Sequence, residues 1–128
     1  MAKLGSISGI VAYVKDPAKT AEFYEKLKFI VYREEKDRVS ARVNWFWIDF
    51  HQIAREKNTE FQKEANLEPK GAGEWLYVSV NDVDEYYKEL LSKGLKPSSE
   101  PRDWPWGNRE FAIRDPDGYK LVFFQKSK

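Results

Sequence analysis

An internal repeat constrains the fold most, because the two halves of the chain present the same order of elements. A strand predicted over residues 6–15 leads to Asp16, and a strand predicted over residues 74–80 leads to Asp82. Each Asp stands where its side chain can accept from the free N–H groups at the start of a helix. Pro17 also suits a first helical position. Duplication of this kind predicts two similar units that share a core or a cleft.

The second half holds the clearer of the two predicted helices. Asp82 and Glu85 form a capping box at its start, and Gly94 follows its end. Apolar residues recur at helical spacing between them, at Val83, Tyr86, Tyr87, Leu90 and Leu91. In the first helix one apolar face is marked by Ala21, Tyr24 and Leu27.

The remaining pattern is that of short strands and turns. Strands are predicted in the first half over residues 29–34, 38–43 and 45–51, and in the second half over residues 109–114 and 119–126. Residues 97–107 are irregular, and Asp-Pro-Asp-Gly at 115–118 is a strong turn signal. The chain is therefore predicted to be an α+β protein of two βαβββ modules.

The module boundaries follow from a polar, uneven segment in the middle of the chain. Residues 1–53 form module one, residues 54–73 a linker with one short helical stretch around 60–65, and residues 74–128 module two. Together the modules make a single domain.

Composition excludes several classes of function. The absence of cysteine excludes disulfides, thiolate metal sites and cysteine nucleophiles, and the single histidine excludes a site that needs two from one chain. A net charge of +1 gives no nucleic-acid footprint. No apolar run approaches the ~20 residues of a membrane span. The start of the chain lacks a signal-like stretch, so a cytoplasmic protein is expected. The aromatic content of 16%, with five Trp, suggests a ligand pocket.

Three segments resemble the vicinal oxygen chelate superfamily of glyoxalases, extradiol dioxygenases, fosfomycin-resistance enzymes and bleomycin-resistance binding proteins. They are DPAKTAEFYEKLKF (16–29), VNDVDEYYKELLSKG (80–94) and WGNREFAIRDPDGYKLVFF (106–124). The resemblance implies that each module curves its mixed sheet into half a cup, with the helix on the convex side. Two modules, from one chain or from swapped chains, would then enclose a ligand or metal site.

The same resemblance locates the positions at which metal-dependent members carry up to four ligands. They correspond to Gly9, Asp49, Trp75 and Val122. Gly and Val have no side-chain donor atom, and Trp offers only an N–H. One carboxylate cannot hold a divalent ion against water. We therefore expect no metal and no cofactor, as in the bleomycin-resistance binding proteins.

These four positions also predict which side chains line the cup, because side chains alternate along a strand. The intervening positions, such as Ile10, Ala12 and Val14, are apolar and suit packing against the helices. Inward positions include Trp45, Ser79 and Lys120, and a loop with two Trp borders the mouth. The predicted ligand contacts are Tyr13, Trp47, Asp49, His51, Trp75, Tyr77, Trp104, Trp106, Val122 and Phe124.

Three hypotheses for function remain open at this point. The preferred one is a metal-free binding protein of the antibiotic-resistance type, a homodimer that sequesters a planar or cationic compound by aromatic stacking and a contact to Asp49. The second is a lyase, isomerase or dioxygenase-like enzyme of the same superfamily, with Asp49 and His51 as acid–base groups. The third is a cup filled by side chains in a protein with an assembly role.

Overall fold

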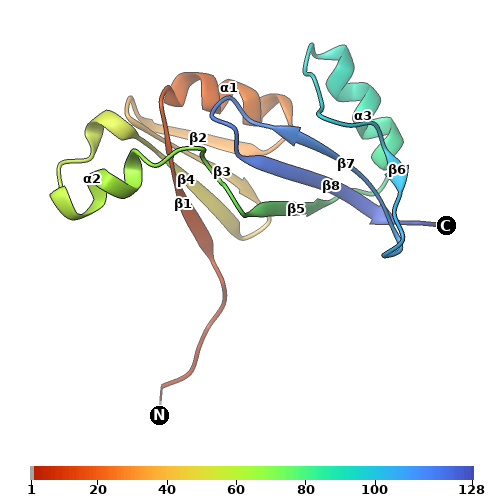
Figure 1. Cartoon of the computed structure of the whole chain (residues 1–128), viewed down its shortest axis with the longest axis horizontal. Coiled ribbons are helices and arrows are strands. Elements are labelled where there is room, and N and C mark those ends of the chain that lie inside the picture. The colour runs from red at the N-terminus through yellow and green to blue at the C-terminus, as the bar shows by residue number, and fades with distance from the viewer. Residues whose placement is uncertain (1) are drawn as a thin grey trace. The chain divides into compact units, whose positions relative to one another are not determined.

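The computed structural model describes residues 2–128, which form two compact units (Figure 1). The first unit ends at Leu67 and the second runs from Glu68 to Lys128, so the division falls inside the polar middle segment. Both units contain a four-stranded sheet with a helix between its first two strands. Within residues 2–128 no helix is both long and apolar enough to cross a membrane.

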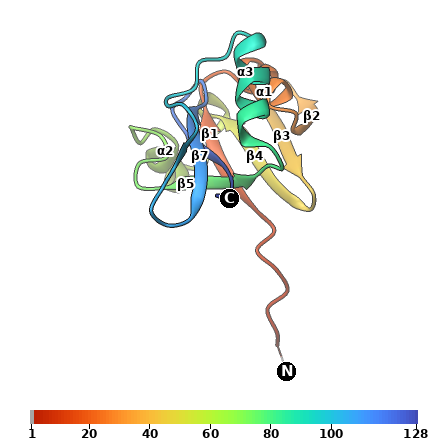
Figure 2. The same cartoon turned by 90° about the vertical axis from the view of Figure 1, so that its right-hand side faces the viewer.

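The first unit is a βαβββ module followed by two short helices. Its elements are β1 (Gly9–Val14), α1 (Pro17–Lys26), β2 (Ile30–Glu35), β3 (Arg38–Val43), β4 (Phe46–Gln52), the 3-10 helix η1 (Ile53–Arg55) and α2 (Thr59–Ala65). The strand order is β1-β4-β3-β2, with β1 parallel to β4 and the other pairs antiparallel. The helix α1 packs against β2, β3 and β4 (Figure 2).

The start of α1 follows the sequence prediction. The Asp16 side chain accepts hydrogen bonds from the backbone N–H of Ala18 at 3.0 Å and of Lys19 at 3.3 Å, and Pro17 occupies the first helical position. After the helix, Lys28 takes the left-handed conformation with φ of 71°, which reverses the chain into β2.

The second unit repeats the βαβββ order. Its elements are β5 (Trp75–Ser79), α3 (Val83–Ser92), β6 (Arg102–Asp103), β7 (Asn108–Arg114) and β8 (Lys120–Lys126). The strand order β5-β8-β7-β6, with β5 parallel to β8, matches that of the first unit. The α+β prediction of two βαβββ modules with mixed sheets is thereby confirmed.

Capping and an ion pair hold α3 against its sheet. The Asp82 side chain accepts from the Glu85 backbone N–H at 3.0 Å, as the capping box predicts. The guanidinium of Arg109 on β7 donates two hydrogen bonds of 2.9 Å to the carboxylate of Asp84 in the first turn of α3. This geometry is the bidentate form that fixes orientation as well as attraction.

One face of each sheet forms the core against the helix of its own unit. The first core contains Ala12, Val14, Val39, Ile48 and Phe50, and the second contains Phe111, Ile113, Leu121 and Phe123, all buried. Of these, Ala12, Val14, Ile48, Phe50, Leu121 and Phe123 occupy the alternate positions that the sequence assigns to the helix side, whereas Ile10, assigned to the same side, is 42% exposed. The opposite face of each sheet carries the residues predicted to line a cup.

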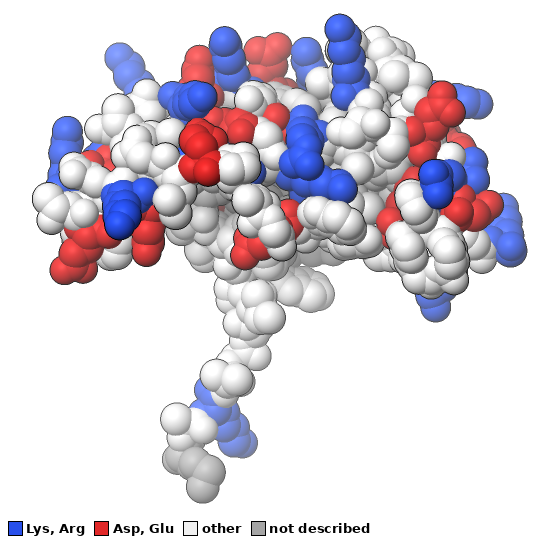
Figure 3. Space-filling view, in the orientation of Figure 1, with Lys and Arg blue, Asp and Glu red and all other residues white. Residues whose placement is uncertain are grey.

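Two local predictions are wrong. Trp45 does not belong to a strand: β4 begins at Phe46, and the Trp45 side chain is 77% exposed in the turn after Asn44, whose φ is 54°. Residues 97–107 are not irregular throughout, because Arg102 and Asp103 pair with β7 as a two-residue strand. On the face shown in Figure 3, basic and acidic side chains are interspersed, consistent with the near-zero net charge.

Candidate functional site

In the first unit the open face is built by the parallel pair β1 and β4. Val11 lies opposite Asp49 and Tyr13 opposite His51 in this pairing, so their side chains share the face away from α1. Trp47, two residues before Asp49, projects on the same side. The four predicted contacts of this unit therefore lie on one surface, where each is half-buried.

Trp47 occupies the space that a side chain at position 9 would need. Gly9 and Trp47 are paired across the strands, and a Cβ atom placed on Gly9 would overlap the indole ring and the carbonyl oxygen of Trp47. A metal-ligating side chain at position 9 therefore cannot coexist with this Trp47 geometry. An aromatic ring fills the place where the resemblance leads us to expect a first-strand ligand.

At the far end of the same face, His51 lies within a cluster of polar groups. The Tyr13 hydroxyl donates to Glu56 Oε2 at 2.7 Å, and the rings of Tyr13 and His51 meet edge to face with centroids 6.0 Å apart. The bond to Glu56 raises the pKa of Tyr13 to about 12 and lowers the pKa of Glu56. Burial, reinforced by the nearby Arg55 guanidinium, lowers the pKa of His51 below its usual value.

His51 and Asp49 share a face but are not hydrogen-bonded to each other in the described part of the chain. His51 Nε2 is buried and has no hydrogen-bond partner among residues 2–128. Because the lowered pKa favours the neutral imidazole, one ring nitrogen is available as an acceptor. Ser40, opposite Asp49 on β3, is likewise buried with its hydroxyl unpartnered in the described residues.

In the second unit the open face is built by β5 and β8. Tyr77 lies opposite Val122, and Trp75 opposite Lys120, so the predicted contacts again share one surface. The Trp75 indole is 59% exposed, with the Lys120 ammonium 3.8 Å from its ring centroid. Val122, by contrast, is only 3% exposed and offers little surface to a ligand. Phe124 is half-buried and meets Tyr77 edge to face.

The loop between β6 and β7 presents its two Trp as a stacked pair. The rings of Trp104 and Trp106 lie 4.8 Å apart at an angle of 11°, and the Arg102 guanidinium lies 3.6 Å from the Trp104 ring centroid. The outer ring, Trp106, is 57% exposed. The loop thus carries a flat aromatic surface that is partly open to solvent.

Sequence reasoning missed Glu110, the residue that joins this loop to the open face. Its buried carboxylate accepts hydrogen bonds from the Tyr77 hydroxyl at 3.3 Å, Trp106 Nε1 at 3.0 Å and Asn108 Nδ2 at 3.2 Å. Burial raises the pKa of Tyr77, and the Glu110 charge and the hydrogen bond between Tyr77 and Glu110 raise it further. The available signal was the alternation along β7, which places Glu110 on the other face of the sheet from the apolar Phe111 and Ile113.

The donor set at the four superfamily positions does not fit a metal ion. Gly9 lies beneath Trp47, Val122 is buried and apolar, and Trp75 faces an ammonium group. Asp49 is the one carboxylate at these positions. Elsewhere among residues 2–128, no three His, Asp or Glu side chains converge in a way that could hold a metal.

Comparison with known proteins relates this arrangement to a family. Residues 6–123 match the family model of the Glyoxalase/Bleomycin resistance protein/Dioxygenase superfamily. Curated relatives described as bleomycin resistance proteins, from Geobacillus stearothermophilus and Staphylococcus aureus, are 36% identical over 52 residues. That match spans 40% of this chain and 39% of the length of each relative.

Solved structures share the fold over nearly the whole chain. A glyoxalase/bleomycin resistance protein/dioxygenase from Nocardioides aligns with a TM-score of 0.82 at 19% identity, covering 100% of this chain and 87% of its own. A superfamily member from Sphaerobacter thermophilus aligns with a TM-score of 0.72 at 20% identity, covering 96% of this chain and 98% of its own. With two βαβββ modules and a family match over residues 6–123, the chain belongs to the glyoxalase/bleomycin resistance protein/dioxygenase superfamily.

Proposed function

We propose that this protein is a metal-independent small-molecule binding protein of the bleomycin-resistance type. The observation that carries the proposal is the placement of the Trp47 indole over Gly9, where the superfamily's metal-dependent members would carry a ligand. The partial match to bleomycin resistance proteins supports the same conclusion. A site that exchanges a metal ligand for an aromatic ring gains a stacking surface and loses Lewis-acid chemistry.

The proposed ligand is planar, because the open faces present flat aromatic surfaces. These surfaces are Trp47 in the first unit, and Trp75 and the Trp104–Trp106 stack in the second. Each ring is at least partly exposed to solvent and can therefore be reached by a ligand. Asp49 is the proposed contact for a cationic group on the ligand. A cation over an aromatic ring contributes roughly 0.5–2 kcal/mol, and a charge-assisted hydrogen bond adds about 1.5–3 kcal/mol. Together these contributions supply roughly 2–5 kcal/mol, so micromolar binding, at about 8 kcal/mol, requires the rest from apolar surface buried against the rings.

The binding form is proposed to be a cytoplasmic homodimer. A mixed sample of Trp47→Ala and Trp75→Ala chains tests whether copies of the chain share a binding site. Restored binding in the mixture requires a site shared between copies, whereas a site within one chain stays defective.

A test of the binding proposal uses a matched pair of planar probes, N-methylquinolinium and quinoline, at pH 7.5. Both should quench Trp fluorescence, and Asp49→Asn should weaken the cation about tenfold while leaving neutral quinoline unchanged. Trp75→Ala should weaken both probes more than Trp104→Ala, since Trp104 is covered by Arg102. Unchanged affinity for both probes in the variants at 49 and 75 would show that these faces are not the binding surface.

A second candidate, catalysis, is favoured by one observation at His51. Its buried Nε2 has no partner in the described residues, and its lowered pKa keeps the imidazole neutral as a general base requires. In this version His51 removes a proton from the ligand and Asp49 stabilises the positive charge that the ring acquires. Turnover of a bound compound that survives a chelator and disappears in both Asp49→Asn and His51→Gln would favour the enzyme. Binding without turnover favours the binding protein.

A further inference from the structure

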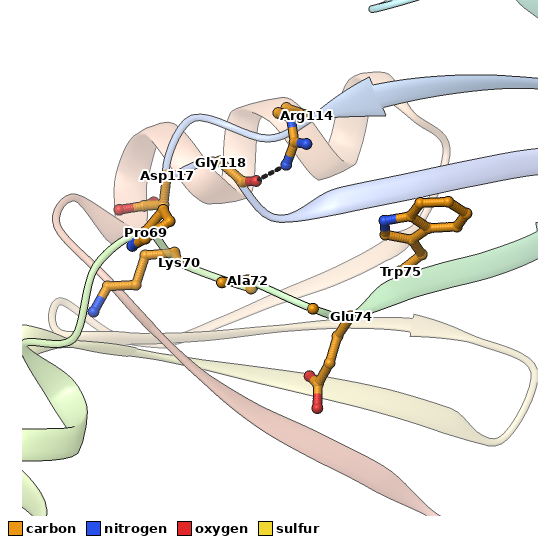
Figure 4. Close-up of a pocket in the computed structure, with 10 residues that line it drawn as sticks. Pro69, Lys70, Ala72, Glu74, Trp75, Arg114, Asp117 and Gly118 are labelled. Carbon is orange, nitrogen blue, oxygen red and sulfur yellow. Dashed lines mark hydrogen bonds between the residues drawn. The ribbon is translucent and has the colours of Figure 1, made fainter.

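A pocket of about 300 Å³ lies entirely within the second unit (Figure 4). The segment before β5, residues 69–74, forms one wall, and the turn between β7 and β8 forms another. Gly71 and Gly73 have no side chains, so part of the wall is bare backbone, and both adopt the left-handed conformation, with φ of 71° and 84°. Trp75 and Arg114 complete the lining. The volume is at the small end of ligand pockets, enough for a molecule of one or two rings.

Two of the lining side chains, Trp75 and Arg114, belong to a row of three across the sheet, whose middle member Lys120 lies beside the pocket and is not part of its lining. Lys120 on β8 is paired with Trp75 on β5 and with Arg114 on β7, so all three project from the same face. Figure 4 shows the Arg114 guanidinium and the Trp75 indole turned toward the space between them. Arg114 donates one hydrogen bond of 2.9 Å to the Gly118 carbonyl, and its other N–H donors have no acceptor in the described part of the chain.

The charge at this row is not neutralised. Among residues 2–128, neither Lys120 nor Arg114 has a carboxylate within ion-pair distance. Like charges directly opposite each other on antiparallel strands destabilise a sheet. The lining also contains Lys70 and the carboxylates of Glu74 and Asp117, and in Figure 4 the Glu74 carboxylate points away from Arg114. Arg114 in the lining and Lys120 beside Trp75 are thus two cations that have no ion-pair partner in the described residues and lie near an exposed indole, an arrangement complementary to a flat anion.

We propose that this pocket binds a planar aromatic acid through its carboxylate. The guanidinium of Arg114 presents the donor geometry that matches a carboxylate. Lys120 adds a second positive charge, and the exposed edge and face of Trp75 accept the ring. The site shares Trp75 with the binding surface proposed above but does not include Asp49, because all of its residues belong to the second unit.

The test compares 2-naphthoate with its neutral isostere 2-naphthamide on the full-length protein. Calorimetry gives the affinities, and the indole N–H resonances, assigned by single Trp→Phe variants, give the location. We expect 2-naphthoate to bind and to shift the Trp75 resonance, with naphthamide about tenfold weaker because it lacks the charge. Arg114→Gln and Lys120→Gln should each weaken 2-naphthoate about fivefold to tenfold. Neither change should alter naphthamide binding.

Lys126→Gln is the matched control. Lys126 lies on the same strand and the same sheet face as Lys120 and is exposed, and its substitution removes the same charge, yet it is paired with Asn108, away from Trp75 and Arg114. Equal losses in Lys126→Gln and Lys120→Gln would reduce the effect to general electrostatics and overturn the proposal. It is also overturned if 2-naphthoate fails to bind at millimolar concentration, or if it shifts Trp47 and leaves Trp75 unchanged. None of these results bears on quinolinium binding at Asp49.

Discussion

Trp106 Nε1 donates a hydrogen bond of 3.0 Å to the Glu110 carboxylate, which also accepts one from the Tyr77 hydroxyl. One buried acceptor thus orients an aromatic residue from β5 and another from the loop before β7. Among the described residues, no cation lies within ion-pair distance of either Glu110 carboxylate oxygen. Three neutral donors, from Tyr77, Trp106 and Asn108, therefore stabilise the negative charge. Glu110 is a positioning residue for the aromatic surface of the second unit.

Glu110→Ala should destabilise the protein and loosen Trp106. The change removes the buried acceptor of the Tyr77 hydroxyl, Trp106 Nε1 and Asn108 Nδ2. Leaving such a buried group unsatisfied costs about 1–3 kcal/mol. Urea unfolding should show this loss, and Trp fluorescence anisotropy should fall. Glu100→Ala, on an exposed loop, is the control and should leave both measurements unchanged. Equal behaviour of the two variants would contradict the role assigned to Glu110.

The pH dependence of stability should carry a contribution from His51. Its pKa is lowered in the folded protein, so the unfolded chain takes up a proton first as the pH falls. Above about pH 7 both states are neutral there and His51 contributes no slope. As the pH falls through about 6.5, stability should decrease, and the decrease should end below the folded-state pKa. Chemical unfolding between about pH 7.5 and 5 should show a shallower decline in His51→Gln than in the native protein. Identical slopes would exclude a lowered pKa.

The fold was predictable because local signals and the repeat agree. Asp16 and Asp82 mark both helix starts, and each accepts the hydrogen bonds expected of an N-cap residue. Alternation within the strands also separates the helix side from the open side, as the burial of Phe50 and Phe123 confirms. These features depend on neighbours in sequence. They therefore need no knowledge of the tertiary structure.

The details of the candidate site were less predictable because they depend on contacts between strands. Nothing local to Gly9 indicates that Trp47 covers it, since the two meet only through the parallel pairing of β1 and β4. Glu110 appears in sequence as one more charged residue, and its carboxylate is satisfied by the Tyr77 hydroxyl on β5, Trp106 Nε1 in the loop before β7 and Asn108 Nδ2 on β7 itself. The contact between the Lys120 ammonium and the Trp75 ring could likewise be predicted only from the register of β5 and β8.

Purified protein should hold no stoichiometric Zn, Ni, Mn or Fe. The superfamily positions at 9, 75 and 122 carry Gly, Trp and Val, and Asp49 alone gives too few donors. Elemental analysis after dialysis is expected to show far less than one metal per chain. One equivalent retained through dialysis would disprove the metal-independent proposal.

Light scattering at micromolar concentration should give a mass about twice the 15.1 kDa of the chain. Strands β1 and β5 each form an edge of their own four-stranded sheet, and Ile10 and Val11 on β1 are 42% and 50% exposed. Edges of this kind are commonly covered by another chain. A monomer mass under these conditions would contradict the homodimer.

Gly9→Ala should destabilise the protein through the Trp47 contact. The added methyl group would overlap both the indole ring and the Trp47 carbonyl oxygen, and overpacking of this kind costs about 1–3 kcal/mol. Trp47→Ala removes the ring but not the carbonyl, so the double variant should recover only part of the cost. A double-mutant cycle by urea unfolding measures this coupling. Strict additivity of the two substitutions would show that the indole does not lie over Gly9, and would remove the observation on which the proposed function rests.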